Sequence, residues 1–152
     1  MISAMKNSIS EVLETMFFLP IDFSDASGMA DLWKSPQEAL AAARIHFSGP
    51  LSGHFLFVVP LGLALSTTAG FLGEDLGSVS REHAHETVKE IANMVAGNTF
   101  SRYDDQAVFN LGIPELLVYN DLTENPGGSG ERVFIGCNTL EDRLAFELVV
   151  RD

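Results

Sequence analysis

A long stretch without formal charge most constrains what this chain can fold into. No Lys, Arg, Asp or Glu occurs between Arg44 and Glu74, and residues 55–73 are mostly apolar. Such a stretch is long enough to be weighed as a transmembrane helix. Pro60 interrupts it, however. The five residues before this proline read as a buried strand, and a proline suits the first turn of a helix. The stretch therefore predicts a strand followed by a helix over about 60–72.

Apolar periodicity predicts another helix at the start of the chain, from about Ser3 to Phe18. Pro20 marks its end, and the segment from Asp22 to Pro36, rich in Asp, Ser and Gly, reads as a loop with room for a short helical turn. The residues of the apolar stripe, spaced at i, i+3, i+4, i+7 and i+8, are Ile9, Val12, Leu13, Met16 and Phe17.

Alternating patterns and turn residues predict the remaining elements. Ser80 is the expected N-cap of a long helix that runs beyond Gly97. The predicted strands are 42–48, 53–59, 116–120, 132–138 and 143–150, with a loop at 125–130. The chain has 152 residues and no linker that would divide it. We therefore expect one α+β domain over 1–152, with helices packed on a single mixed or antiparallel sheet.

The strand predicted from Arg143 to Val150 lies near the end of the chain, and we expect it at an edge of the sheet. An exposed apolar edge pairs readily with a second copy of the same chain. The sequence therefore predicts a homodimer.

The charge balance narrows the classes of partner. The chain has nine Lys and Arg residues and 21 Asp and Glu residues, which gives a net charge of −12. A surface this acidic repels phosphate backbones and anionic lipid, so we expect neither a nucleic acid nor a membrane partner.

Cys137 is the single cysteine, which excludes an intrachain disulfide. Glu11 and Glu14 stand where a signal peptide would be apolar, and we expect a cytoplasmic protein.

One face of the helix after Ser80 carries a narrow stripe of four residues. At 100° per residue, Glu86, Glu90, Asn93 and Gly97 fall within about 60° of one another. The apolar residues lie on the opposite side of the helix and are Ala84, Val88, Ile91, Ala92 and Val95. Glu90 and Asn93 are i, i+3 neighbours, so they can address one target together.

A stripe of this kind is usually only the solvent-facing side of an amphipathic helix. Two of its residues favour a function. Asn has a low helix propensity, so propensity does not explain Asn93 within a helix. Gly97 lowers helix stability by about 1 kcal/mol relative to Ala, and it lets another backbone approach closely. His83 and His85 point about 200° apart on a helix, so they do not share a metal ion. Cys137 is expected to be a buried structural thiol.

The sequence from Glu90 to Asn98, EIANMVAGN, resembles the E-x-x-N signature of the CheC/CheX/FliY family, phosphatases of the chemotaxis response regulator CheY. Residues 47–57 resemble the strand–turn–strand of that family, residues 71–75 the end of its first core helix, and residues 11–16 its opening helix. The resemblance covers most of the chain. It implies a CheC-like fold with pseudo-symmetric halves, and it also implies a homodimer.

Two-site members of the family carry a second E-x-x-N on the opening helix. The corresponding residues here, 14–17, end in Phe17 where Asn would stand, so the chain resembles the one-site CheX type. Two positions depart from the family motif. Glu86 occupies a position that holds Asp or Ser, and Pro114 follows Asn93 by 21 residues, slightly earlier than the family's proline.

The resemblance implies a hydrolase acting on a phosphorylated CheY-like response regulator. Asn93 would orient the attacking water and Glu90 would pair with a lysine of the partner, with Glu86 and Gly97 as further partner contacts. It implies no metal and no cofactor on this chain, because Mg²⁺ belongs to the response regulator. An alternative stays open: a non-catalytic module that binds a receiver domain or a flagellar switch component through the same helix.

Overall fold

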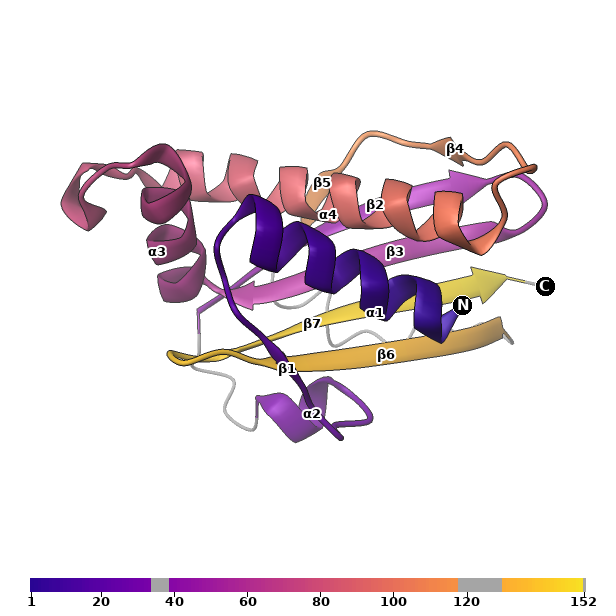
Figure 1. Cartoon of the computed structure of the whole chain (residues 1–152), viewed down its shortest axis with the longest axis horizontal. Helices are drawn as coiled ribbons and strands as arrows, with labels where there is room; N and C mark the ends of the chain where they lie inside the picture. The colour runs from indigo at the N-terminus through magenta and orange to yellow at the C-terminus, as the bar shows by residue number, and fades with distance from the viewer. Residues whose placement is uncertain (34–38, 118–129, 152) are drawn as a thin grey trace.

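The structure, a computed structural model, describes residues 1–33, 39–117 and 130–151 (Figure 1). The helices are α1 (Ile2–Ser10), the π-helix η1 (Glu11–Met16), α2 (Met29–Leu32), α3 (Leu61–Leu72), the 3₁₀ helix η2 (Leu76–Ser78) and α4 (Arg81–Tyr103). The strands are β1 (Asp22–Phe23), β2 (Leu40–Ser48), β3 (Ser52–Pro60), β4 (Asn110–Leu111), β5 (Glu115–Leu117), β6 (Gly130–Asn138) and β7 (Arg143–Arg151).

The described strands form one antiparallel sheet in the order β1-β6-β7-β3-β2-β4, and β5 also pairs with β2. The predicted α+β class with helices on a single sheet is confirmed. The expected edge position of the strand from Arg143 to Val150 is wrong, because β7 pairs with β3 on one side and with β6 on the other. The edge therefore gives no support to a homodimer.

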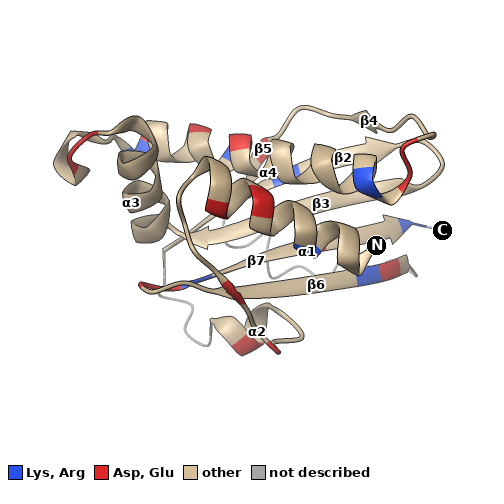
Figure 2. Cartoon of the chain, in the orientation of Figure 1, with Lys and Arg blue, Asp and Glu red and all other residues tan. Residues whose placement is uncertain are grey.

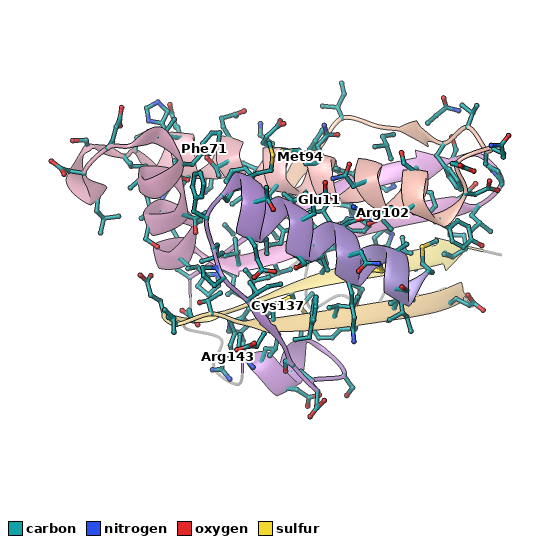
Figure 3. The ribbon with its side chains drawn as sticks, viewed as in Figure 1. Glu11, Phe71, Met94, Arg102, Cys137 and Arg143 are labelled. Atoms are coloured by element: carbon teal, nitrogen blue, oxygen red, sulfur yellow. The ribbon has the colours of Figure 1, made fainter. Side chains whose placement is uncertain are left out.

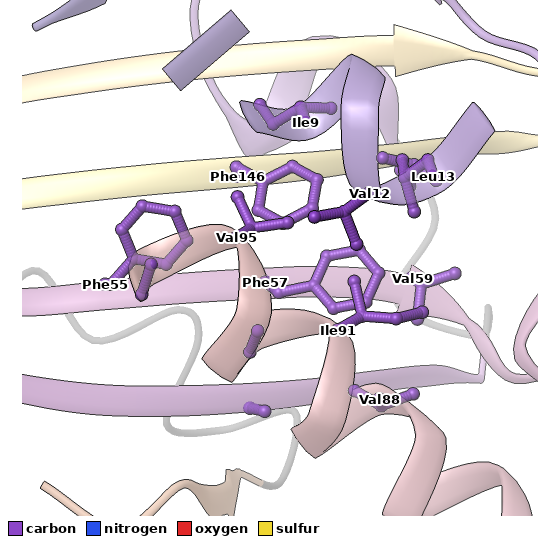
Figure 4. Close-up of a cluster of buried hydrophobic side chains, with 14 of the residues drawn as sticks. Ile9, Val12, Leu13, Phe55, Phe57, Val59, Val88, Ile91, Val95 and Phe146 are labelled. Atoms are coloured by element: carbon purple, nitrogen blue, oxygen red, sulfur yellow. The ribbon is translucent and has the colours of Figure 1, made fainter. Parts of the chain in front are cut away.

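One face of the sheet is covered by α1, η1, α3 and α4, and the main core lies between these layers (Figure 1). Phe57 and Phe146 stack across neighbouring strands with ring centroids 4.5 Å apart. Figure 4 shows these rings close to apolar side chains of η1 and α4, among them Val12 and Val95. Because strand residues alternate between faces, Phe55, Phe57 and Val59 of β3 all point into this core.

The opposite face of the sheet holds a smaller cluster. Leu32 and Trp33, at the end of α2, are buried there against Leu56, Val58 and Ala145. Gly136 of β6 leaves room for this packing, since a Cβ atom there would stand 3.3 Å from Leu32 Cδ1. The segment between Asp22 and Pro36 thus contains a four-residue helix within the part that the structure describes.

The strand and helix predicted from the charge-free stretch are β3 and α3. Pro60 is the last residue of β3 and the N-cap of α3, so it precedes the helix rather than opening its first turn. Gly73 ends α3 with a positive φ of 68°, a conformation that favours glycine at a helix C-terminus. Within the described residues, no helix is long and apolar enough to cross a membrane.

The opening helix differs from its prediction. It is α-helical only to Ser10 and continues as the π-helix η1, where Phe17 N–H donates to the carbonyl of Val12 five residues earlier. The wider turn shifts the side chains that follow. Phe17 is buried at 4% exposure as expected, whereas Met16 leaves the predicted stripe and is 43% exposed.

The other strand predictions hold with small changes at their ends. Residues 42–48, 53–59, 132–138 and 143–150 all lie within observed strands. Of the strand expected over 116–120, residues 116 and 117 belong to β5 and the rest lie outside the described residues. The loop expected at 125–130 also lies outside them, except for Gly130, which begins β6.

Candidate functional site

The helix α4 is held in place by its ends and by its apolar face. The Ser80 hydroxyl accepts a hydrogen bond from His83 N–H at 3.1 Å, so Ser80 is the N-cap as predicted. The apolar face is confirmed, because its five predicted residues are at most 3% exposed. Arg102 lies in the last turn, where a cation complements the helix dipole.

The stripe of four residues faces away from this core. Glu86 and Glu90 are exposed, and Gly97 is half-buried. Asn93 is half-buried rather than fully exposed as predicted. Residues near the edge of the stripe lose exposure because α1 and η1 pack against one side of α4 and β5 also contacts this helix.

Glu90 and Asn93 keep their polar groups available. Within the described parts of the chain, the Glu90 carboxylate has no ion-pair partner and the Asn93 carboxamide forms no hydrogen bond. Glu86 differs, because its Oε1 atom lies 2.7 Å from Lys89 Nζ. The arrangement therefore offers one free carboxylate and one free amide, one turn apart, on a rigid helix.

The helix beside α4 does not repeat this pair. Glu14 of η1 is exposed and accepts a hydrogen bond from the Ser10 hydroxyl. Phe17 is buried, and its ring lies 4.7 Å from that of Phe71 on α3. Figure 2 shows acidic residues on both η1 and α4, but only α4 combines them with an accessible amide.

An ion pair joins the two helices. Arg102 of α4 and Glu11 of η1 are paired, and Figure 3 shows both side chains between α1 and α4. Glu90 lies three helical turns before Arg102, so this pair leaves the stripe uncovered.

The polar groups with shifted pKa values lie on the other face of the sheet. Burial, helped by the nearby Arg44 guanidinium, lowers the pKa of His54 to about 4. Burial raises the pKa of Glu147, and Arg132 at 3.4 Å opposes that rise. The hydrogen bond from Arg44 lowers the pKa of Glu115. Glu115 pairs with Arg44 of β2 and Glu147 with Arg132 of β6, and none of these groups belongs to α4.

Cys137 is fully buried in β6, as predicted, and burial raises the pKa of its thiol to about 12. A thiol held neutral in this way is a poor nucleophile. His83 is exposed and His85 is half-buried on α4. Among the residues that the structure describes, no group of three or more His, Cys, Asp or Glu side chains could hold a metal ion.

The sequence interpretation stopped the stripe at Gly97, but it continues to the end of α4. At 100° per residue, Ser101 and Asp104 fall within about 60° of the direction of Glu86. Both line a groove of about 500 Å³ together with Gly97. The helical angle of Asp104, which equals that of Glu86, was the sequence signal that could have indicated this extension of the stripe. The other wall of the groove is formed around Phe109. The sequence of this segment has no periodic pattern that would have placed it beside α4.

A family model and several solved structures resemble this chain. Residues 41–138 match the family model described as chemotaxis phosphatase CheX. No match was found among curated protein sequences. The crystal structure of the chemotaxis protein CheX from Vibrio vulnificus superposes with a TM-score of 0.78 at 19% identity, covering 99% of this chain and 95% of that one.

Two further solved structures extend the comparison. CheX in the CheX–CheY–BeF₃–Mg²⁺ complex from Borrelia burgdorferi has a TM-score of 0.73 at 14% identity, covering 99% of this chain and 97% of that one. FliY from Thermotoga maritima has a TM-score of 0.64 at 14% identity, covering 96% and 84%. These likenesses show a common fold. Because the family model also matches more than half of its 152 residues, the chain belongs to the CheX family.

Proposed function

We propose that this protein accelerates hydrolysis of the aspartyl phosphate on a CheY-like response regulator. The observation that carries the proposal is the pair formed by Glu90 and Asn93, which stand one turn apart on the outward stripe of α4 without partners among the described residues. Membership of the CheX family supports the reaction. The solved complex of a related CheX with CheY supports the class of partner.

In the proposed reaction, Asn93 orients the attacking water. Its carboxamide oxygen accepts a hydrogen bond from that water and points a lone pair of the water oxygen at phosphorus. The new P–O bond forms as the bond from phosphorus to the aspartyl oxygen breaks, and the aspartate carboxylate leaves. Both protons of the water go to the phosphate, which is released as H₂PO₄⁻. An amide has no useful basicity, so positioning is its contribution.

Glu90 acts as an anchor in this proposal. Its free carboxylate pairs with a lysine beside the phosphorylated aspartate and so fixes the receiver against α4. The response regulator supplies Mg²⁺, which neutralises the phosphoryl oxygens. This chain then needs no cofactor of its own, because it adds a positioned water to a site that already holds charge stabilisation.

Decay of a phosphorylated receiver domain tests the proposal directly. A CheY-like receiver is phosphorylated with a small-molecule donor, and loss of the aspartyl phosphate is followed with and without catalytic amounts of this protein. We expect several turnovers per molecule and faster decay in proportion to its concentration. Binding of the receiver without faster decay would instead identify the non-catalytic module.

The homodimer remains a proposal that rests on family resemblance alone. The two outermost described strands, β1 and β4, have two residues each. Because β1 pairs only with Cys137 and Asn138, most of the outer edge of β6 has no strand partner within the described residues. Light scattering over a range of concentrations tests it, and a monomer at every concentration would contradict it. A phosphorylated response regulator is a cytoplasmic partner, so the proposed function also implies a cytoplasmic location.

A further inference from the structure

A surface groove lies beside the C-terminal half of α4, between this helix and the segment that leads to β4. Its volume is about 500 Å³. The apolar part of its lining comes from Phe100, Phe109 and Leu111, and Asp104 and Asp105 stand at its polar side. The sequence from Asn110 to Leu111 pairs with the end of β2, which holds this wall against the sheet.

The floor of the groove is fixed by aromatic packing. The ring of Phe100 stacks on that of Phe109 with centroids 4.7 Å apart, and it also contacts Phe47 of β2 at 4.5 Å. Tyr103 meets the edge of Phe109 at 6.5 Å. Rings held from several sides form a preformed apolar surface, so little order has to be gained when a ligand binds.

Gly97 keeps the groove open, and the fold itself does not require a glycine there. A Cβ atom at this position would have Leu111 Cδ1 at 3.9 Å as its nearest neighbour, which is an ordinary contact. Alanine would therefore fit and would favour the helix. A larger side chain would extend into the groove. The glycine thus costs helix stability and leaves space that no described part of this chain fills.

The charge at the rim points to the chemistry of the occupant. Asp104 and Asp105 are exposed. Asp104 accepts a hydrogen bond from the backbone N–H of Gln106, and Asp105 accepts one from the Gln106 side chain. Neither carboxylate has an ion-pair partner among the described residues. An apolar floor beside two unpaired carboxylates fits an apolar side chain that has a Lys or Arg next to it. A second copy of this acidic chain is a poorer match.

The groove is continuous with the stripe that carries Glu90 and Asn93. At 1.5 Å per residue, Gly97 lies about 6 Å and Asp104 about 17 Å along the helix from Asn93. A single domain of ordinary size covers that distance. A receiver whose phosphorylated aspartate sits at Asn93 would therefore also lie over the groove.

We propose that this groove is a docking pocket for the receiver domain, taking an apolar side chain flanked by a Lys or Arg. The inference rests on the proposed function and extends it, because it assigns affinity to a region that takes no part in the chemistry. Contacts made equally in the bound complex and in the transition state alter the half-saturating receiver concentration and leave turnover unchanged.

Gly97→Leu tests the pocket by filling it. We expect the half-saturating concentration of phosphorylated receiver to rise about tenfold, with turnover at saturation within twofold of the wild type. Gly62→Leu is the matched control, because Gly62 is an exposed glycine of α3 whose Cβ position meets nothing within 4 Å. It should leave both values unchanged. Gly97→Ala should raise Tm, which checks that the helix tolerates a side chain at this position.

The double variant Asp104→Asn, Asp105→Asn tests the rim without adding volume. We expect affinity for the receiver to fall about fivefold and its dependence on salt to weaken. Unchanged half-saturation in both this variant and Gly97→Leu, in a wild type that is active, would overturn the pocket and leave the proposed function standing.

Binding separates the pocket from the reaction. Titration calorimetry with a receiver loaded with Mg²⁺ and BeF₃⁻ measures affinity in the absence of hydrolysis. If the wild type binds without hydrolysing phosphate, and Gly97→Leu weakens binding about tenfold, the pocket stands although the proposed function fails. If Gly97→Leu changes self-association in light scattering while receiver affinity stays the same, the occupant is a second copy and the proposal is wrong.

Discussion

Two helices lie side by side on the same face of the sheet and run in opposite directions, yet they present different chemistry (Figure 1). Both contain a glutamate followed three residues later by the position that carries Asn in the E-x-x-N signature. In α4 these residues are Glu90 and Asn93, one exposed and one half-buried. In the opening helix they are Glu14 and Phe17, one exposed and one in the core.

The difference is one of backbone as well as of side chain. In α4, positions i and i+3 fall on one face because the helix is regular. In η1 the hydrogen bond from Phe17 N–H reaches Val12, five residues back, so each turn holds more residues. The fourth residue of the motif then turns toward the core while Glu14 stays outside. The contrast shows that an E-x-x-N spacing places both side chains on one face only where the helix is a regular α-helix.

The largest effect is expected from removing the buried ring. Phe17→Ala should lower the free energy of unfolding by about 3–5 kcal/mol, because the ring is almost fully buried and leaves a cavity. Urea unfolding measures the change. Phe18→Ala is the control, since its ring is 73% exposed and should change stability by less than about 0.5 kcal/mol. Lost activity in a Phe17→Ala protein that is fully folded would contradict a single-site enzyme.

Phe17→Asn asks whether the opening helix can be turned into a site. We expect no gain of hydrolysis, because the π-helix directs this position into the core and not toward Glu14. The unfolding free energy should fall by at least as much as in Phe17→Ala, since an amide is buried in place of a ring. Measured in an Asn93→Ala background, recovery of phosphate release would show that the two helices are equivalent after all.

The contrast also marks what the sequence could and could not predict. The periodicity of α4 and the alternation of β2 and β3 are local patterns, so these elements and the outward stripe were predicted. A π-helix inserts one residue into a helical turn and has no pattern of its own, so the exposure of Met16 was missed. The strand order is not local either. The near-continuous apolar run from Leu144 to Val150 was a sign that β7 is covered on both faces.

Asn93→Ala is expected to give the next largest effect. Turnover at saturating receiver should fall about 100-fold, which is about 2.7 kcal/mol, because the water loses its positioning group. The half-saturating concentration should stay nearly the same, since the interaction is made only in the transition state. Asn7→Ala on α1 is the control, because it removes an exposed amide from the neighbouring helix. Wild-type turnover in Asn93→Ala would favour the binding module.

Glu90→Ala should act mainly on docking. We expect the half-saturating concentration to rise about tenfold, because the carboxylate no longer pairs with the receiver's lysine. The dependence of affinity on salt should also weaken. Glu131→Ala is the charge-matched control, since Glu131 is exposed on β6. An unchanged salt dependence with lower turnover would reassign Glu90 from anchor to a role in the chemical step.

The smallest effect is expected at the contact between the two helices. Glu11 and Arg102 form an ion pair whose side chains are 49% and 43% exposed, so solvent screens most of its attraction. A double-mutant cycle with Glu11→Ala and Arg102→Ala should give a coupling of about 0.2–1 kcal/mol. Hydrolysis should be unchanged in all three variants, because the buried apolar face of α4 sets its position. If Glu11→Ala instead slowed turnover tenfold at unchanged stability, the opening helix would take part in the site, and the contrast between the two helices would no longer hold.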